Sequence, residues 1–271
     1  MSDKLSSLLH ALEKADSAAS LTDAVQDLAD ACWVEAVPHL VEALSYNNPG
    51  AAVAAVDGLV KLGEPSVAPL LEQLDLNNYT ARAWAIRALA SIGDPRGLLT
   101  LLGAATADIS MSVRRAAARG LGQMQWRQFP PNLLEIAQTE ALDALLFVAQ
   151  NDEEWVVRYA TVVGLESLAL SLQPGQEEKL TQIETQFAEM SLREDSLSVR
   201  ARVWQAQQTL QVRLVQQPVA TSQVKSSVLS STDWEQILER LYNRKLKERT
   251  VLPAGDPRHY QELLSAGTRQ A

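Results

Sequence analysis

The chain has 271 residues, of which 46% are hydrophobic and only 5% aromatic, enough apolar surface to bury a core in one or two domains. A formal net charge of −9 argues against a general nucleic-acid-binding protein, which needs a basic surface, and the single cysteine excludes an intramolecular disulfide. The polar N-terminus lacks the apolar core of a signal peptide, and no stretch reaches the roughly 18 apolar residues of a membrane span. These features predict a cytoplasmic protein that binds no nucleic acid and has no membrane span.

A leading helix is predicted over about residues 3–18, within an N-terminal capping region at residues 1–20. The segment after it reads as an atypical first repeat. Residues 44–63 then match residues 74–93 at a shift of 30, and a third copy follows at a shift of 32. Two further, more degraded copies come later in the chain. Self-similarity at such a period is typical of stacked helical repeats.

Each copy reads as two helices. In residues 81–92 the apolar side chains recur at helical spacing and form one stripe. Gly93 suits the left-handed residue that follows a helix, and Asp94-Pro95 suits the start of the next one. Because a single pair of helices cannot bury its apolar face, neighbouring pairs must stack. The sequence therefore predicts an all-α fold, a right-handed α/α superhelix (solenoid) of about six HEAT-like repeats over residues 21–212.

The remaining segments interrupt or follow this repeat array. Residues 126–142 read as an insertion in the third unit, where Pro130-Pro131 should break any helix. Residues 213–231 are rich in Gln, Ser and Val and lack acids, so they read as a linker. Residues 232–271 open with a capping-box pattern, which predicts a short amphipathic helix followed by a loosely ordered tail.

Motifs for a metal or for a bound nucleotide are absent from the sequence. There is no glycine-rich phosphate-binding motif, and the three histidines, His10, His39 and His259, are scattered. A metal site is therefore not expected. Cys32 adjoins Trp33 in an apolar helix and is predicted to be buried and inert.

Some polar residues recur at fixed repeat positions. One arginine occupies the same position in four copies, which favours a structural role in which its stem packs and its head pairs across a repeat boundary. These arginines are Arg82, Arg114, Arg158 and Arg200. The Asn47-Asn48 pair lies between two helices, where asparagine favours a turn.

Positions that depart from the repeat are better candidates for a ligand. Trp84 stands where other copies have alanine, and Arg87 and Arg119 share a position that is Asp57 in an earlier copy. A planar ring beside two cations suits a conjugated anion. A large ring can also fill a packing gap, and exposed arginines can also be a solvated face, so both interpretations stay open.

The segments AAVDGLVKLG, ARAWAIRALASIGDPR and SVRRAAARGLG resemble the phycobilisome lyase E/F family, and within it the F-type subunits. The close match spans residues 46–122. The resemblance implies a lyase subunit that helps to attach a linear tetrapyrrole, phycocyanobilin, through a thioether bond to a cysteine of a phycobiliprotein alpha subunit. It also implies a heterodimer with an E-type subunit, and no cofactor besides the bilin substrate. Isomerising relatives carry an Asn-His-Cys motif that is missing here, so bilin isomerisation is not expected.

The resemblance also implies a bilin site. A bilin carries two propionates, conjugated rings and pyrrole nitrogens, which call for cations, aromatic surface and a carboxylate. Asp57 is the candidate catalytic carboxylate. The candidate bilin-binding residues are Tyr46, Tyr79, Arg82, Trp84, Arg87, Arg115 and Arg119. The nucleophile is the acceptor's cysteine, so the lyase would work mainly by orienting its substrate. A non-catalytic scaffold or chaperone in phycobilisome assembly or degradation, built from the same repeats, is the alternative.

Overall fold

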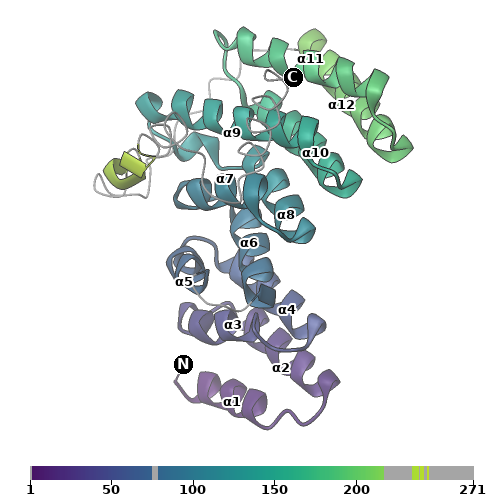
Figure 1. Cartoon of the computed structure of the whole chain (residues 1–271). Helices are drawn as coiled ribbons and strands as arrows, with labels where there is room; N and C mark the ends of the chain where they lie inside the picture. The colour runs from purple at the N-terminus through teal and green to yellow at the C-terminus, as the bar shows by residue number, and fades with distance from the viewer. Residues whose placement is uncertain (1, 75–78, 217–233, 238, 241–242, 244–271) are drawn as a thin grey trace, which may run out of the picture. The chain divides into compact units, whose positions relative to one another are not determined.

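The computed structural model describes residues 2–74, 79–216, 234–237, 239–240 and 243 (Figure 1). Within these ranges every regular element is a helix and no strand occurs, which confirms the all-α repeat fold predicted from the sequence. None of the helices described is long and apolar enough to cross a membrane. The chain divides into two compact units, which comprise residues 1–97 and residues 98–271.

Unit 1 consists of helices stacked in two layers. Its α-helices are α1 (Ser2–Glu13), α2 (Ala18–Ala31), α3 (Val37–Ala43), α4 (Pro49–Leu62), α5 (Val67–Gln73) and α6 (Tyr79–Ile92). The longer helices α2, α4 and α6 pack side by side in one layer, and the shorter α3 and α5 pack together in the other (Figure 1). Helix α1 packs against α2.

Local capping chemistry sets the helix boundaries in unit 1. Ser17 opens a capping box at the start of α2. Asn48 caps α4 by accepting the Ala51 N–H at 3.1 Å, and its own amide donates to the Ala18 carbonyl at 2.8 Å. The asparagine predicted to form a turn therefore also ties α4 to α2. Gly93 has a φ of 67°, which confirms the left-handed residue predicted after α6.

Small and medium apolar side chains fill the core of unit 1. The fully buried leucines include Leu28, Leu40, Leu59 and Leu70, one from each of four successive helices. Burial of a leucine side chain contributes about 1.5–3 kcal/mol to the free energy of unfolding. Trp84 on α6 packs against this core but is only partly buried, so part of its ring faces solvent.

The prediction that Cys32 is buried is wrong, because the thiol is exposed. Cys32 is the residue that ends α2, and its φ of 53° is left-handed. A residue at this cap position no longer has helical backbone angles. Its side chain therefore does not point in the direction that the helical spacing predicts. Residues other than glycine rarely adopt a left-handed φ, and the helical spacing of the sequence gave no sign of it.

Unit 2 repeats the same two-layer arrangement. Its α-helices are α7 (Leu98–Ala107), α8 (Met111–Gly122), α9 (Pro131–Asn151), α10 (Trp155–Ser171), α11 (Glu177–Arg193) and α12 (Leu197–Gln216). Helices α8, α10 and α12 form one layer, and α7, α9 and α11 form the other (Figure 1). The predicted array limits of 21–212 fall inside α2 and α12, and most of the predicted linker and tail lies outside the described residues.

Helices α8 and α10 approach each other unusually closely. A Cβ atom on Gly122 would lie 1.9 Å from the Gly164 carbonyl oxygen, and one on Gly164 would lie 2.4 Å from the Ala118 carbonyl oxygen. Only glycine fits at these two positions, so the backbones of the two helices are in direct contact.

Two of the recurring arginines join successive repeats of unit 2. Arg114 Nε donates to Asp152 Oδ2 at 2.6 Å, and Arg158 Nε donates to Glu194 Oε2 at 2.7 Å. Each arginine also donates to two carbonyls at the start of its own helix, those of residues 108 and 109 for Arg114 and of residues 152 and 153 for Arg158. We call these four side chains, Arg114, Asp152, Arg158 and Glu194, the arginine–acid ladder. Their geometry confirms the predicted role of the recurring arginine at these two positions.

The acids of the ladder also fix where the next helix begins. Asp152 accepts the Glu154 N–H at 3.0 Å, and Glu194 accepts the Ser196 N–H at 2.9 Å. Each of these acids therefore bonds to the backbone just before one helix while it binds the arginine of the previous helix in the same layer. The hydrogen bonds from Arg158 lower the pKa of the Glu194 carboxyl below its ordinary value, and burial opposes this shift. The ladder thus sets the register of α8, α10 and α12.

The predicted insertion at residues 126–142 is continuous with the array. Its first part is a short 3-10 turn over Trp126–Gln128, and α9 begins at Pro131. Proline suits the first position of a helix because the N–H that it lacks has no partner there. The proline pair therefore separates the turn from α9 and does not interrupt a helix.

The described part of the C-terminal segment is helical and packs on unit 2. Residues 234–237, 239–240 and 243 are helical, and Trp234 and Ile237 are buried. The Trp234 ring lies 5.5 Å from the Phe129 ring, which in turn lies 5.3 Å from the Trp126 ring. Trp234 and Ile237, the described part of the apolar face predicted for this segment, are therefore buried, and Trp234 packs against the predicted insertion.

Candidate functional site

Trp84 and Arg87 form the best-defined part of the predicted site in unit 1. They are one helical turn apart on α6, and the Arg87 guanidinium carbon lies 5.4 Å from the centre of the Trp84 ring. This distance suits a cation–π contact. Arg87 is exposed, and Trp84 is supported from below by the core. The pair offers a flat ring and a cation at the surface of the same helix.

The other candidates of unit 1 lie on neighbouring elements. Tyr46 follows α3 and is partly buried, and the pKa of its hydroxyl is raised by burial and by the nearby Glu42 carboxylate. Asp57 is exposed on α4 and helps to raise the pKa of Lys61, after the larger effect of Asp30. Asp57 is therefore accessible to a ligand at the surface.

Two further candidates lie on α6. Arg82 is partly buried there, and Tyr79 is the first residue of the helix. The side chain of Tyr79 lies outside the described part of the structure. For Tyr79 the structure therefore shows only its position in the chain fold, whereas for Arg82 it also shows that the side chain is partly buried.

Arg115 and Arg119 belong to unit 2. Both are exposed and lie one turn apart on α8, and Arg119 Nε donates to Gln123 Oε1 at 3.3 Å. Arg114, next to them in the chain, turns inward to the ladder instead. The predicted site residues thus fall into two groups, one on each unit. Each group presents cations at the surface, and the group in unit 1 adds an aromatic ring.

Two exposed aromatic side chains were missed by the sequence analysis. Trp155 and Tyr159 lie one turn apart on α10, with exposed fractions of 47% and 37%. Helix α10 carries apolar residues on all of its sides. The spacing of these residues therefore did not distinguish the exposed rings of Trp155 and Tyr159 from side chains of the core. Comparison with the matching repeat positions, Met111 and Arg115 on α8, could have indicated them.

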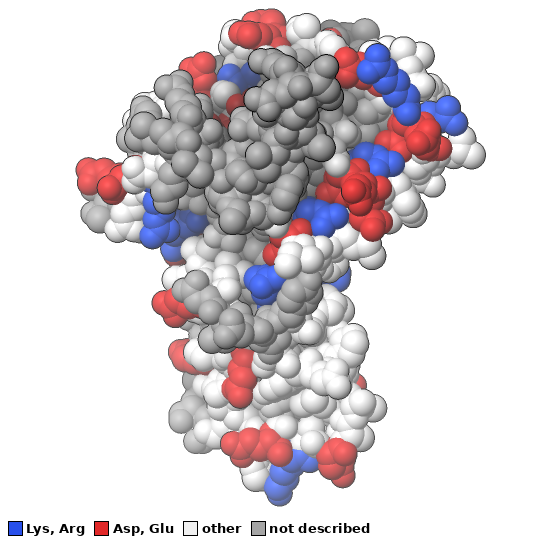
Figure 2. Space-filling model, viewed as in Figure 1, with Lys and Arg blue, Asp and Glu red and all other residues white. Residues whose placement is uncertain are grey.

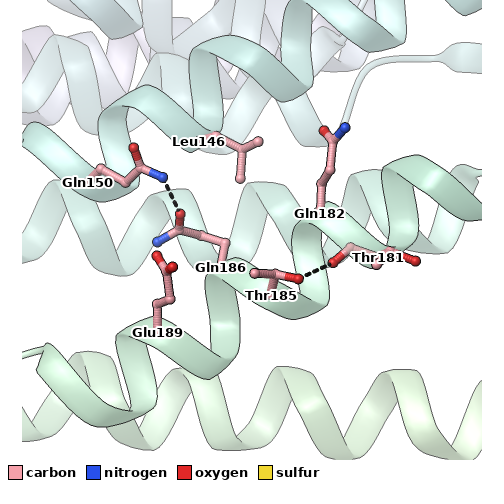
Figure 3. A pocket seen from close by; sticks show the side chains of 7 residues that line it. All are labelled: Leu146, Gln150, Thr181, Gln182, Thr185, Gln186 and Glu189. Atoms are coloured by element: carbon pink, nitrogen blue, oxygen red, sulfur yellow. Dashed lines mark hydrogen bonds between the residues drawn. The ribbon is translucent and has the colours of Figure 1, made fainter.

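A pocket of about 230 Å³ lies between α9 and α11 in unit 2 (Figure 3). It is lined by amide and hydroxyl side chains with one acid, and Gln150 donates to Gln186 across it at 2.7 Å. No aromatic ring or cation lines it, so it does not match a conjugated dianion. Small-molecule sites are commonly about 300–1,000 Å³, so the pocket is also small for such a ligand.

Two further features of the described residues concern their metal-ligating and charged side chains. Among these residues, no group of three or more His, Cys, Asp or Glu side chains could hold a metal ion. Figure 2 shows acidic and basic side chains interleaved on the face in view, without one broad basic surface.

Stacked helix pairs of this kind define a HEAT-type helical-repeat protein. Residues 67–169 match the sequence profile of HEAT repeats. A solved structure of the complex of CpcE and CpcF of phycocyanin lyase from Nostoc sp. contains a similar chain, with a TM-score of 0.60 and 44% identity. The similarity covers 65% of this chain and 99% of that one.

Curated relatives identify the family. The chain is 57% identical over 278 aligned residues to the phycocyanobilin lyase subunit beta of Pseudanabaena tenuis, and the match covers 99% of each chain. It is 50% identical over 166 residues to the phycocyanin alpha phycocyanobilin lyase CpcF of Synechocystis sp., which covers 61% of this chain and 77% of the relative. The chain belongs to the family of phycocyanobilin lyase beta subunits, which confirms the resemblance to F-type subunits.

Proposed function

We propose that this chain is the beta, or F-type, subunit of a cytoplasmic phycocyanobilin lyase. The lyase assists the attachment of phycocyanobilin, through a thioether bond, to a cysteine of the phycocyanin alpha subunit. The observation that carries this proposal is the 57% identity to a phycocyanobilin lyase subunit over 99% of both chains. Identity at this level over nearly all of both chains supports a shared activity.

The active form is a heterodimer with an E-type subunit. Support comes from the related solved structure, which is a complex of CpcE and CpcF. The acceptor follows from a second relative, whose name specifies phycocyanin alpha. Because a carbon–sulfur bond forms between the acceptor's thiol and the bilin, the lyase needs no nucleophile of its own. Cys32 therefore has no part in this reaction.

The exposed ring and cations of the chain would hold the bilin. In unit 1 the Trp84 ring would contact a conjugated pyrrole ring and Arg87 would bind a carboxylate. In unit 2 Arg115 and Arg119 would bind propionate carboxylates through charge-assisted hydrogen bonds. The exposed Asp57 carboxylate would accept hydrogen bonds from pyrrole N–H groups. In this arrangement the lyase accelerates attachment mainly by holding the bilin in one orientation for the acceptor's thiol.

Co-expression of four components tests the function. The chain, an E-type subunit, the phycocyanin alpha subunit and the enzymes that make phycocyanobilin should together yield an alpha subunit with covalent bilin. A denaturing gel stained with zinc reveals the covalent product by its fluorescence. Omission of this chain should abolish the fluorescent band. If the band is equally strong without this chain, the chain is not a lyase subunit and the scaffold alternative is favoured.

A further inference from the structure

Helices α8, α10 and α12 lie in the same register, so equivalent residues form rows across them. The N–H groups of Arg114, Arg158 and Arg200 each bond to the carbonyl four residues earlier, at 3.0, 3.1 and 3.0 Å. The hydrogen bonds from the Glu154 and Ser196 N–H groups to Asp152 and Glu194 repeat in the same way. Two kinds of residue therefore occupy matching places on neighbouring helices. One is the residue that directly follows each of these arginines, and the other is the residue one helical turn before or after each arginine.

Two of these rows are exposed and rich in large side chains. The first row holds Met111, Trp155 and Leu197, which are 49%, 47% and 72% exposed. The second row sets Arg115 on α8 beside Tyr159 on α10. The backbones of α8 and α10 touch at Gly122 and Gly164, so the two rows run across helices that pack directly against each other. Large apolar side chains gathered at a surface mark an interaction site more often than isolated ones do.

The helices that carry these rows contain few acids, although the whole chain has 33 acidic and 24 basic residues. Helices α8 and α12 contain no acidic residue, and α10 contains only Glu166, which binds Arg202. In the described part of the chain, Arg115 and Arg119 have no acidic side chain within 4 Å. Their charge is therefore available to a ligand, whereas that of Arg114 is neutralised by Asp152.

We propose that Trp155 and Tyr159 bind the conjugated rings of the bilin, while Arg115 and Arg119 bind its two carboxylates. This inference rests on the proposed function and adds two residues to its site. Side chains one turn apart on a helix have Cβ atoms about 5–6 Å apart, so the arginine pair can receive two carboxylates carried by neighbouring rings. The aromatic pair on α10 then lies beside the remaining part of the ligand.

The charges around the site also orient the ligand. Glu153 and Glu154 are exposed immediately before Trp155, so they repel carboxylates from that end of α10. The propionates are therefore expected toward Arg119 and the uncharged rings toward Trp155. The same two acids would also repel an acidic surface on a protein partner, so the bilin suits this site better than such a partner.

Binding of phycocyanobilin to the full-length chain in complex with its E-type subunit tests this inference. The double variant Trp155→Ala and Tyr159→Ala should weaken binding about tenfold or more, because two ring contacts are lost. The bilin's absorbance change on titration gives the dissociation constant. Trp204→Ala is the matched control, since Trp204 is 64% exposed on α12 but lies outside both rows. Tyr159→Phe keeps the ring and should retain most of the affinity.

The outcomes separate this inference from the proposed function. If the double variant binds phycocyanobilin as tightly as the wild-type complex, the rings do not contact the bilin and the inference is wrong. If the double variant no longer elutes with the E-type subunit in sizing chromatography, the face is a protein interface and the inference is also wrong. If the wild-type complex itself neither binds nor attaches bilin, it is the proposed function that fails.

Discussion

Adjacent arginines on α8 have different roles because the helix turns their side chains in different directions. Arg114 is mostly buried, with 17% of its side chain exposed, and pairs with Asp152, which is only 6% exposed. Arg115 and Arg119 point to solvent instead. An exposed arginine contributes little to the stability of a fold, whereas removal of a partner from a buried pair leaves an unsatisfied charge. The two kinds of arginine should therefore respond differently to mutation.

Replacement of the exposed arginines should affect activity and spare the fold. The double variant Arg87→Glu and Arg119→Glu is expected to abolish bilin attachment in the co-expression assay while helicity and association with the E-type subunit stay normal. The reason is that both side chains are exposed, so their loss costs little stability. A matched pair of exposed arginines, Arg127→Glu and Arg193→Glu, should retain attachment. Normal attachment by the first variant would show that its arginines are only a solvated face.

Replacement of a ladder arginine should affect the fold. Arg158→Ala should lower the free energy of unfolding by about 1.5–3 kcal/mol, since hydrogen bonds to a charged group are lost. Glu194 is only 4% exposed, so solvent cannot replace them. Arg193→Ala, an exposed neighbour, should change the free energy by less than about 0.5 kcal/mol. Urea unfolding at neutral pH measures both, and equal effects of the two variants would contradict the role assigned to the ladder.

The same pair predicts a pH dependence. The folded pKa of Glu194 lies below its unfolded value, so the pair's contribution to stability is fully present above the unfolded pKa. That contribution is lost as the pH falls through the lowered folded pKa. The destabilisation caused by Arg158→Ala should therefore be largest above about pH 5 and shrink in acid. Unfolding curves of wild type and variant between neutral and acidic pH would reveal the convergence, and a constant difference would contradict it.

At the level of the helices, small residues decide how closely repeats stack. Gly122→Ala should lower the free energy of unfolding by about 1–3 kcal/mol or more, because the added methyl group meets the Gly164 carbonyl. Gly103→Ala is the control, since nothing lies within 4 Å of a Cβ placed there. That change should stabilise α7 by up to about 1 kcal/mol, the usual gain of alanine over glycine within a helix. Thermal unfolding of the two variants should therefore shift in opposite directions, and a Gly122→Ala variant as stable as wild type would show that the helices can separate freely.

Helix positions were predictable from the sequence where the signal is local. The apolar stripe of residues 81–92 and the left-handed Gly93 depend on neighbouring residues, and both match the structure. The left-handed Cys32 was not predictable, because nothing in its residue type favours that conformation. The recurrence of Arg114 and Arg158 predicted that they pair between repeats, but recurrence could not name Asp152 and Glu194 as the partners.

The candidate site was predictable only in part. Departures from the repeat pointed to Trp84 and Arg87, and the structure places them in contact. The same comparison was not applied to Trp155 and Tyr159, whose exposure depends on which face of α10 is covered by α8 and α12. Exposure of this kind follows from packing between helices distant in sequence, and residue spacing within one helix does not contain that information.

At the scale of the whole molecule, the C-terminal segment returns to the middle of the chain. Trp234→Ala should release this segment from Phe129, because the buried Trp234 ring packs against the Phe129 ring. Hydrogen exchange of residues 234–240 is expected to speed up while the helices of unit 2 keep their protection. Gln236→Ala, at an exposed position of the same segment, should leave exchange unchanged. Equal protection in wild type and the Trp234 variant would mean that other contacts hold the segment.

The arginine–acid ladder also bears on how such arrays change length over evolution. Each of the two ladder arginines pairs with the acid of the immediately following repeat, and that acid also bonds to the backbone just before its own helix. A duplication or deletion of one whole repeat would therefore restore every link at the new junction without compensating mutations elsewhere. Gene segments encoding such repeats can be copied or lost as single modules, so related chains are free to differ in length while their stacking chemistry stays the same.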